Sequence, residues 1–366
     1  MPRRQIRYAV VGLGHIAQVA MLPAFANSRR NSKLTALVSS DSSKKKILAK
    51  RYGVERTYSY DEYDACLKSG EIDAVYIALP NSLHHEYALR AAQAGIHVLC
   101  EKPMALEEEQ CLRMSEAAKA ARAKLMVAYR LHFERANLEA IEVLRSGRLG
   151  EPRLFSSTFC TPVEPGNVRV RRETGGGVLY DIGIYCINAA RSLFRDEPIE
   201  VQATTAGVRG EVEEAVAGCL RFPGDRLATF NCSFGAAKVS EYRVAGTKGD
   251  LCVEPAYDYA RPLKHRLTLG GETRERRYAK RDQFAPELLY FSDCILLNRE
   301  PEPGAEEGLA DVRVIRALYR SAETGRPVEL ERFERRDRPS LEQEIRRPPI
   351  DKPEVIHARA PSGGSR

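Results

Sequence analysis

The 366-residue chain has no apolar run of the ~18–20 residues that a membrane-spanning helix needs. It leaves no room for a secretory signal, because a strand-like apolar run already begins at Ile6. The nine cysteines are scattered, odd in number and free of C-x-x-C spacing, which argues against a disulfide framework and against structural zinc. We therefore expect a cytoplasmic protein whose thiols stay reduced.

The chain also lacks any segregation of charge. The net charge is +7, from 57 basic and 50 acidic residues, and the two signs are interspersed. Neither a recognition helix nor an RNA-binding signature accompanies this charge, so nucleic-acid binding is the weaker interpretation. The His, Cys, Asp and Glu residues form no pattern typical of metal ligands, and we predict no metal site.

The first 130 residues alternate short apolar runs with helical patterns. The runs are apolar on both faces, as buried parallel strands are, and such alternation predicts βαβ units. We assign residues 1–130 to a Rossmann domain, a doubly wound parallel sheet in an α/β fold. The predicted strands are Ile6–Val11, Leu34–Val38, Ile72–Leu79, Ile96–Cys100 and Lys124–Ala128, and the predicted helices are Ala17–Asn27, Ser43–Tyr52, Asp61–Lys68, His84–Ala94 and Glu107–Ala121.

Residues 131–330 have a different pattern, because strand-like runs follow one another with few helices between them. We predict a substrate-binding α+β domain with a large, mostly antiparallel open sheet, through which a homodimer or homotetramer would form. The predicted strands are Arg153–Thr161, Glu200–Val208, Ala215–Phe222, Arg226–Ser233, Glu241–Ala245 and Leu251–Glu254, and the predicted helices are Arg135–Arg145, Leu179–Leu193 and Gly308–Thr324.

Residues 331–366 form a third segment, with five prolines and alternating charges. A flexible tail is the simpler interpretation of this composition. An arm that embraces a neighbouring subunit is the alternative.

A glycine-rich turn, Gly12-Leu13-Gly14-His15-Ile16-Ala17, follows the first predicted strand and opens the first predicted helix. In this G-x-G-x-x-A spacing, Gly12 permits the tight turn and Gly14 lets the backbone approach a pyrophosphate. The N–H groups of the helix start attract phosphates. The turn therefore predicts a dinucleotide site, and a tight turn without a ligand is the less favoured alternative.

The end of the second predicted strand bears on the choice between NAD and NADP. NAD-binding proteins usually place a carboxylate there for the ribose hydroxyls, whereas this chain has Ser39 and then Lys44-Lys45-Lys46. A hydroxyl, a cation and free N–H groups together suit a 2′-phosphate. Asp41 favours NAD instead, because it could hold the ribose, and the lysines could form a solvated helix face. We predict NADP, with NAD possible.

The segment Glu101-Lys102-Pro103 directly follows a predicted strand. A lysine at the carboxyl end of a parallel strand points into the crevice where open α/β sheets bind ligands. Pro103 fixes φ and removes a backbone donor, so it holds Lys102 at a rigid corner. A positive charge beside a bound dinucleotide can stabilise a reacting oxygen.

Two further stretches complete the pattern, Leu79-Pro80-Asn81-Ser82-Leu83-His84 and the glycine-rich Gly175-Gly176-Gly177-Val178-Leu179-Tyr180-Asp181-Ile182-Gly183-Ile184-Tyr185. With the turn and the E-K-P segment, they make the chain resemble the glucose-fructose oxidoreductase/inositol dehydrogenase family over about residues 5–330. Many members have histidine and aspartate where this chain has Tyr185 and Asn188. That difference resembles the glucose-fructose oxidoreductase branch.

The resemblance implies catalytic roles for three residues. Lys102 would stabilise the reacting sugar oxygen, Tyr185 would give or take the proton, and Asp181 would orient the sugar or the lysine. It also implies a cis peptide before Pro103. Arg130 and His132 would line the substrate pocket, and the cofactor would contact Gly12, Gly14, His15, Ile16, Ser39, Lys44, Pro80, Asn81, His84 and Glu101.

The expected chemistry is consistent with these roles. Loss of hydride from a sugar carbon needs a base for the hydroxyl proton, and a tyrosine with its usual pKa of ~10 is a poor one. An ammonium within ~4–6 Å favours the phenolate, so Lys102 would make Tyr185 useful, although Tyr185 could instead be a core residue. We predict an NADP-dependent sugar oxidoreductase that acts on an aldose, a ketose or a sugar lactone. A non-catalytic dinucleotide sensor of the same fold is the alternative.

Overall fold

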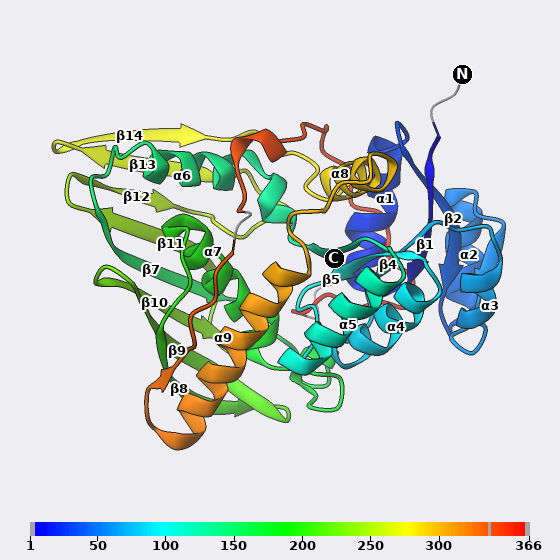
Figure 1. The fold of residues 1–366 in the computed structure, drawn as a ribbon, viewed down its shortest axis with the longest axis horizontal. Coiled ribbons are helices and arrows are strands. Elements are labelled where there is room, and N and C mark those ends of the chain that lie inside the picture. The colour runs from blue at the N-terminus through cyan, green and yellow to red at the C-terminus, as the bar shows by residue number, and fades with distance from the viewer. Residues whose placement is uncertain (1–3, 336–337, 363–366) are drawn as a thin grey trace.

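The computed structural model describes residues 4–335 and 338–362, which form two sheets (Figure 1). The first sheet has six parallel strands in the order β3-β2-β1-β4-β5-β6, the order of a doubly wound dinucleotide-binding fold. The predicted Rossmann fold is confirmed. Its strands are β1 (Ile6–Val11), β2 (Ser32–Val38), β3 (Arg56–Tyr58), β4 (Ala74–Ile77), β5 (His97–Glu101) and β6 (Leu125–Ala128).

Helices cover both faces of this sheet, because successive residues of β1 point to opposite sides. Ala9 and Val11 belong to one apolar core, whereas Tyr8 and Val10 belong to another. The helices of this part are η1 (Ala17–Met21), α1 (Leu22–Ala24), η2 (Phe25–Asn27), α2 (Ser42–Tyr52), α3 (Tyr63–Lys68), α4 (Asn81–Gln93), α5 (Glu108–Ala120) and η3 (Arg130–Phe133).

Helix α8 (Ala285–Leu296) returns from the second half of the chain to the first sheet. Leu288 and Phe291 pack in the same core as Tyr8 and Val10, and the Tyr8 hydroxyl lies 2.8 Å from the Ser292 hydroxyl. The apolar core on this face of the first sheet is therefore built from both halves of the chain. This helix was not predicted from the sequence, because most of its residues are buried and it has no polar stripe to mark a period.

The second sheet has nine strands in the order β14-β13-β12-β11-β7-β10-β9-β8-β15. All its pairs are antiparallel except β7 with β10, so the predicted, mostly antiparallel open sheet is confirmed. Its strands are β7 (Pro152–Cys160), β8 (Glu200–Arg209), β9 (Val212–Phe222), β10 (Arg226–Ser233), β11 (Val239–Gly246), β12 (Gly249–Val253), β13 (Lys264–Leu269), β14 (Glu272–Arg277) and β15 (Val328–Glu329).

Helices pack on one face of this second sheet and share its apolar core. The β13–β14 hairpin was not predicted from the sequence, because β14 is exposed along its whole length and has no apolar alternation. Across the described ranges, every helix is too short or too polar to cross a membrane. The remaining helices are η4 (Val168–Val170), η5 (Leu179–Gly183), α6 (Arg135–Arg145), α7 (Ile184–Phe194), α9 (Ala305–Thr324) and η6 (Leu341–Gln343).

The tail lies against its own chain, in contrast to the flexible tail expected from composition. The Arg338 guanidinium lies 2.8 Å from a Glu197 carboxylate oxygen, and that of Arg335 lies 2.9 Å from Glu302. Both arginine side chains are almost fully buried. Such pairs hold the tail because a buried cation is costly unless it meets a carboxylate.

Candidate active site

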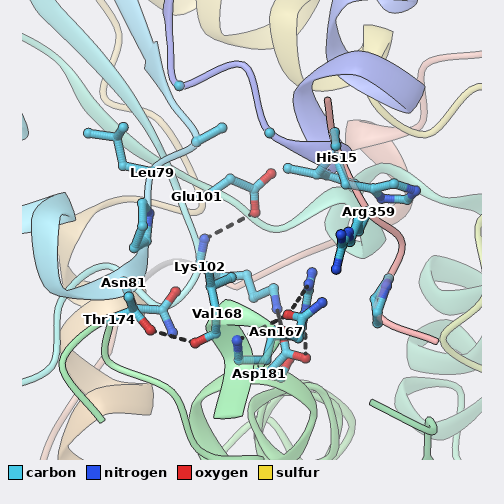
Figure 2. A pocket seen from close by; sticks show the side chains of 18 of the residues that line it. His15, Leu79, Asn81, Glu101, Lys102, Asn167, Val168, Thr174, Asp181 and Arg359 are labelled. Atoms are coloured by element: carbon cyan, nitrogen blue, oxygen red, sulfur yellow. Dashed lines mark hydrogen bonds and ion pairs between the residues drawn. The ribbon is translucent and has the colours of Figure 1, made fainter. Parts of the chain in front are cut away.

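A cavity of about 810 Å³ opens between the two sheets. One wall comes from segments that follow β1, β2, β4 and β5, where the carboxyl ends of the parallel strands meet. The opposite wall comes from the second sheet and from the turns before α7, with Asn167 and Asp181 among the residues shown in Figure 2. This is the position at which doubly wound sheets bind dinucleotides.

The glycine turn has the shape that a pyrophosphate needs. Gly12 has φ +92°, and a Cβ there would lie 2.5 Å from the Ala78 carbonyl oxygen, so only glycine fits. At Gly14 a Cβ would meet nothing within 4 Å, and this residue lines the cavity. The open side of the turn thus faces the cavity and fits the diphosphate of a nicotinamide dinucleotide.

At the end of β2, Ser39 and Lys44 also line the cavity. Asp41 caps α2, with its Oδ1 accepting from the Lys44 backbone N–H at 2.8 Å. Its Oδ2 lies 2.8 Å from Nδ1 of His357 in the tail. The Lys44 bond and then the His357 bond lower the pKa of Asp41. Both oxygens are therefore engaged, which weakens the alternative that Asp41 holds a ribose.

Lys102 stands at the corner after β5, and the peptide before Pro103 is cis, as the resemblance implied. Its Nζ donates to the Asp181 carbonyl oxygen at 2.7 Å and lies 3.6 Å from Asp181 Oδ1. Behind it, the Tyr76 hydroxyl donates to Glu101 at 2.5 Å. Burial raises the pKa of Glu101. The lysine side chain is thus fixed between the two halves of the chain.

Asp181 receives a second cation, because Arg169 Nε donates to its Oδ2 at 2.9 Å. Burial opposes ionisation, but Arg169 and then Lys102 lower the pKa of Asp181 overall. Close approach of the Arg169 segment requires glycine: a Cβ on Gly176 would lie 2.4 Å from the Arg169 carbonyl oxygen. The triple glycine therefore explains how Asp181 reaches its partner.

Tyr185, in the first turn of α7, lies against two cations. The Lys102 Nζ is 4.7 Å and the Arg130 Cζ is 5.3 Å from the centre of its ring. Phe159 and Tyr257 contact the same ring at centroid distances of 5.5 and 5.8 Å. The predicted lysine–tyrosine pair is therefore present, on the cavity wall.

Arg130 lines the cavity but is held mainly by protein groups. Its Nη2 donates to the Tyr257 carbonyl oxygen at 2.6 Å, and its Nη1 donates to Gln283. Burial opposes its charge, but the phenols of Tyr185 and then Tyr259 raise the pKa of Arg130. The Arg130 guanidinium is therefore close enough to favour the phenolate form of Tyr185, and it also faces the cavity in which a substrate would bind.

Two of the three predicted histidines, His84 and His132, make hydrogen bonds to protein groups. The ring nitrogens of His84 lie 2.7 Å from the Pro103 carbonyl oxygen and 2.9 Å from that of Leu79, so this residue joins two corners of the cavity wall. His132 is outside the main cavity, bonded to Asn188 at 2.9 Å and stacked on Tyr129. His132 lines a second, smaller cavity together with Lys102, Arg130 and Tyr185. Its Nδ1 lies 3.8 Å from Glu302 Oε1, and its contact with a substrate stays a prediction.

The other predicted residues come together around one cavity. Arg169 could not be predicted, because a lone arginine in the short helix η4 has no spacing that marks it. The tail residues could not be predicted either, because composition alone favoured disorder. The predicted residues that line the cavity are Gly12, Gly14, His15, Ile16, Ser39, Lys44, Pro80, Asn81, His84, Glu101, Lys102, Arg130, Asp181 and Tyr185.

This fold and cavity define the class of dinucleotide-dependent oxidoreductases. The family description "Oxidoreductase family, NAD-binding Rossmann fold" matches residues 6–129, and "GFO/IDH/MocA C-terminal domain" matches residues 137–252. The chain belongs to the GFO/IDH/MocA family of oxidoreductases.

Several of the relatives have names that describe oxidoreductases acting on sugars. D-xylose 1-dehydrogenase [NADP(+)] of Haloarcula marismortui is 35% identical and covers 89% of this chain and 93% of its own. The crystal structure of aldose-aldose oxidoreductase from Caulobacter crescentus, complexed with glycerol, has 40% identity and a TM-score of 0.85, covering 89% of this chain and all of its own. A 3-ketoreductase of Actinomadura kijaniata, in complex with NADP and TDP-benzene, has 27% identity and a TM-score of 0.80, covering 87% of this chain and 98% of its own.

Proposed function

We propose that this protein is an NADP-dependent oxidoreductase that acts on the CH–OH group of a sugar, with an aldose, a ketose or a sugar lactone as substrate. The observation that carries the proposal is the Lys102–Tyr185 pair, 4.7 Å apart from nitrogen to ring centre, on the wall of the cavity that also contains the glycine turn and Lys44. The sugar dehydrogenases among the relatives support it.

NADP supplies the hydride acceptor or donor when it is bound. The Lys102 ammonium has three N–H donors, and Asp181 takes at most two of them. The third can hydrogen-bond to the reacting sugar oxygen and stabilise its negative charge. Tyr185 accepts the hydroxyl proton in oxidation and returns it in reduction, next to the positive charges of Lys102 and Arg130.

NADP is the favoured cofactor because Ser39 and Lys44 line the cavity where a 2′-phosphate would lie. Asp41 is the one residue that favoured NAD. Its two carboxylate oxygens are hydrogen-bonded to the Lys44 backbone N–H and to His357 Nδ1. The remaining predicted cofactor contacts, from the glycine turn to Glu101, line the same cavity.

A panel of aldoses that includes D-xylose and D-glucose, assayed with NADP+ by nicotinamide absorbance, tests the proposal. We expect turnover by the wild-type protein, and loss of turnover in Lys102→Met and Tyr185→Phe. Lys119→Met, at an exposed position of α5, is the matched control and should keep the wild-type rate. Full activity in both site variants would contradict the assignment, and cofactor binding without turnover on any sugar would favour the non-catalytic sensor.

We also propose that two or four copies associate through the open face of the second sheet. Leu154 on β7 and Leu227 on β10 are paired in register, and their side chains are 53% and 39% exposed. Adjacent exposed leucines are typical of a contact surface. Light scattering during size-exclusion chromatography should give a dimer or tetramer, and Leu154→Lys should dissociate it; a wild-type monomer would refute this part.

A cytoplasmic location is part of the same proposal. It is supported by the nine cysteines, all of which are free thiols in the structure. Fractionation of cells that produce the protein would check it.

A further inference from the structure

The end of the tail forms part of the cofactor cavity. The red ribbon in Figure 1 leaves the second sheet and returns towards the middle of the molecule. Five residues of the tail line the cavity together with the glycine turn: His357, Ala358, Arg359, Pro361 and Ser362. The family matches end at residue 252, so this contribution lies outside the family domains that identify the chain.

Two anchors hold this segment on the Rossmann side of the cavity. Gln18, fully buried in the first helical segment, accepts from the Ile356 N–H at 2.7 Å and donates to the Ile356 carbonyl oxygen at 2.8 Å. The same amide nitrogen donates to the Leu13 carbonyl oxygen inside the glycine turn, at 2.9 Å. One residue later, His357 bonds to Asp41 at the end of β2. The tail is therefore fixed to both ends of the predicted cofactor site.

A third anchor lies on the opposite wall. The Glu164 N–H, in the loop after β7, donates to the Pro361 carbonyl oxygen at 2.9 Å. Residues 356–361, which we call the strap, thus run from the first half of the chain to the second. Because its two ends are fixed on opposite walls, the strap has to cross the cavity that it lines.

The strap carries one cation into the cavity. Arg359 lies between the two sets of anchors, and Figure 2 shows it on the same side of the pocket as His15 of the glycine turn. Within the described residues Arg359 has no hydrogen-bond or ion-pair partner. The positive charges of Arg169 and Lys352 are also close to the glycine turn. Together with burial, which has the largest effect, they lower the pKa of His15 to about 4. A dianionic diphosphate is the ligand that would balance this charge.

We propose that the strap closes over the bound dinucleotide and that Arg359 binds its diphosphate, so that the cofactor is released slowly. This inference rests on the proposed NADP site. Hydrogen bonds between a guanidinium and phosphate oxygens are strong and often bidentate. The backbone anchors position the arginine, and the segment must detach from at least one wall before the dinucleotide can leave.

Stopped-flow displacement of NADPH from the full-length protein tests the strap. Bound NADPH is followed by fluorescence while excess NADP+ replaces it. We expect Arg359→Ala to raise the release rate about tenfold or more, and Arg359→Glu to raise it further, because one charge-assisted contact accounts for about one to two orders of magnitude. Deletion of residues 355–366 should raise both association and release rates, since it removes the cover as well as the contact.

Arg332→Ala is the matched control, because this arginine belongs to the same tail but does not line the cavity, and its side chain is 86% exposed. It should leave both rates unchanged. Thermal unfolding without cofactor separates a folding defect of the deletion from a binding effect, and Arg359→Glu keeps the test valid if the deletion variant does not fold. Unchanged or slower release in the Arg359 variants would overturn the strap. Failure of the wild-type protein to bind NADPH would overturn the proposed function instead.

Discussion

The Lys102 ammonium lies over the face of the Tyr185 ring, 4.7 Å from its centre. Its two contacts with Asp181 fix it there. Because Lys102 follows β5 and Tyr185 begins α7, the pair forms only when both halves of the chain are folded together. Chemistry at this site therefore depends on the packing of the two sheets.

Tyr185→Phe should remove the proton-transfer group and keep the ring. We expect kcat for sugar oxidation to fall about 10²–10⁴-fold, the usual contribution of general acid–base catalysis. The contacts of the ring with Phe159 and Tyr257 involve no hydroxyl, so the melting temperature should stay close to that of the wild-type protein. Steady-state kinetics and thermal unfolding measure both, and a large fall in melting temperature would show that the residue acts in packing instead.

Asp181→Asn should lower both activity and stability, with a defined dependence on pH. The folded-state pKa of Asp181 is lowered, against the penalty of burial, by Arg169 and Lys102. Its ionisation therefore stabilises the fold above the unfolded value of ~3.9, and this contribution is lost as the pH falls through the folded-state value. In urea unfolding at pH 7, the free energy of unfolding should be larger for the wild type than for the variant, and this difference should shrink below pH ~4. A constant difference would contradict the ion-pair role.

Lys44→Ala should discriminate between the two cofactors. Loss of a charge-assisted contact with a 2′-phosphate would weaken NADPH binding about 10–100-fold, whereas NADH binding should change little. Lys46→Ala is the control, because Lys46 lies on the same helix, is exposed and does not line the cavity. Equal weakening of NADPH and NADH in a fluorescence titration would mean that Lys44 does not contact the extra phosphate.

His132 should make the protein lose stability in mild acid. Burial, opposed by the bond to Asn188, lowers the pKa of His132 to about 4. Between pH 6.5 and 4 the unfolded chain therefore binds a proton that the folded protein does not, and the free energy of unfolding falls by about 1.4 kcal/mol per pH unit. His132→Asn should reduce the slope by that amount in chemical denaturation. His15 and His265, whose pKa values are also lowered to about 4, continue to contribute to the slope in the variant. An unchanged slope would contradict this reasoning.

Much of the fold could be predicted, because short buried strands and amphipathic helices leave clear periods in the sequence. The predicted bounds of β1, β10 and α6 coincide with the structure. The failures have physical causes: α8 is buried nearly all round, and β14 is exposed on both faces, so neither shows a stripe of one polarity.

The residues of the candidate site also fall into those that the sequence predicts and those that it does not. Motif residues such as Gly12 and Lys102 could be found because a turn or a strand end requires them at fixed spacing. Arg169 and Arg359 could not, because they reach the cavity from the short helix η4 and from the tail, whose positions depend on tertiary contacts. The role of His132 stays a prediction, because its ring lines a smaller cavity beside Lys102 and Tyr185 while its Nε2 lies 2.9 Å from Asn188 Oδ1.

The return of α8 to the first sheet has a consequence for anyone who wishes to cut or recombine this enzyme. We expect that the nucleotide-binding half does not fold on its own, because Ile6, Tyr8 and Val10 share their apolar core with Leu288 and Phe291. A fragment that stops at residue 130 would present that bare surface to water and aggregate. A functional chimera would have to carry both the early and the late stretches of the chain from the same parent.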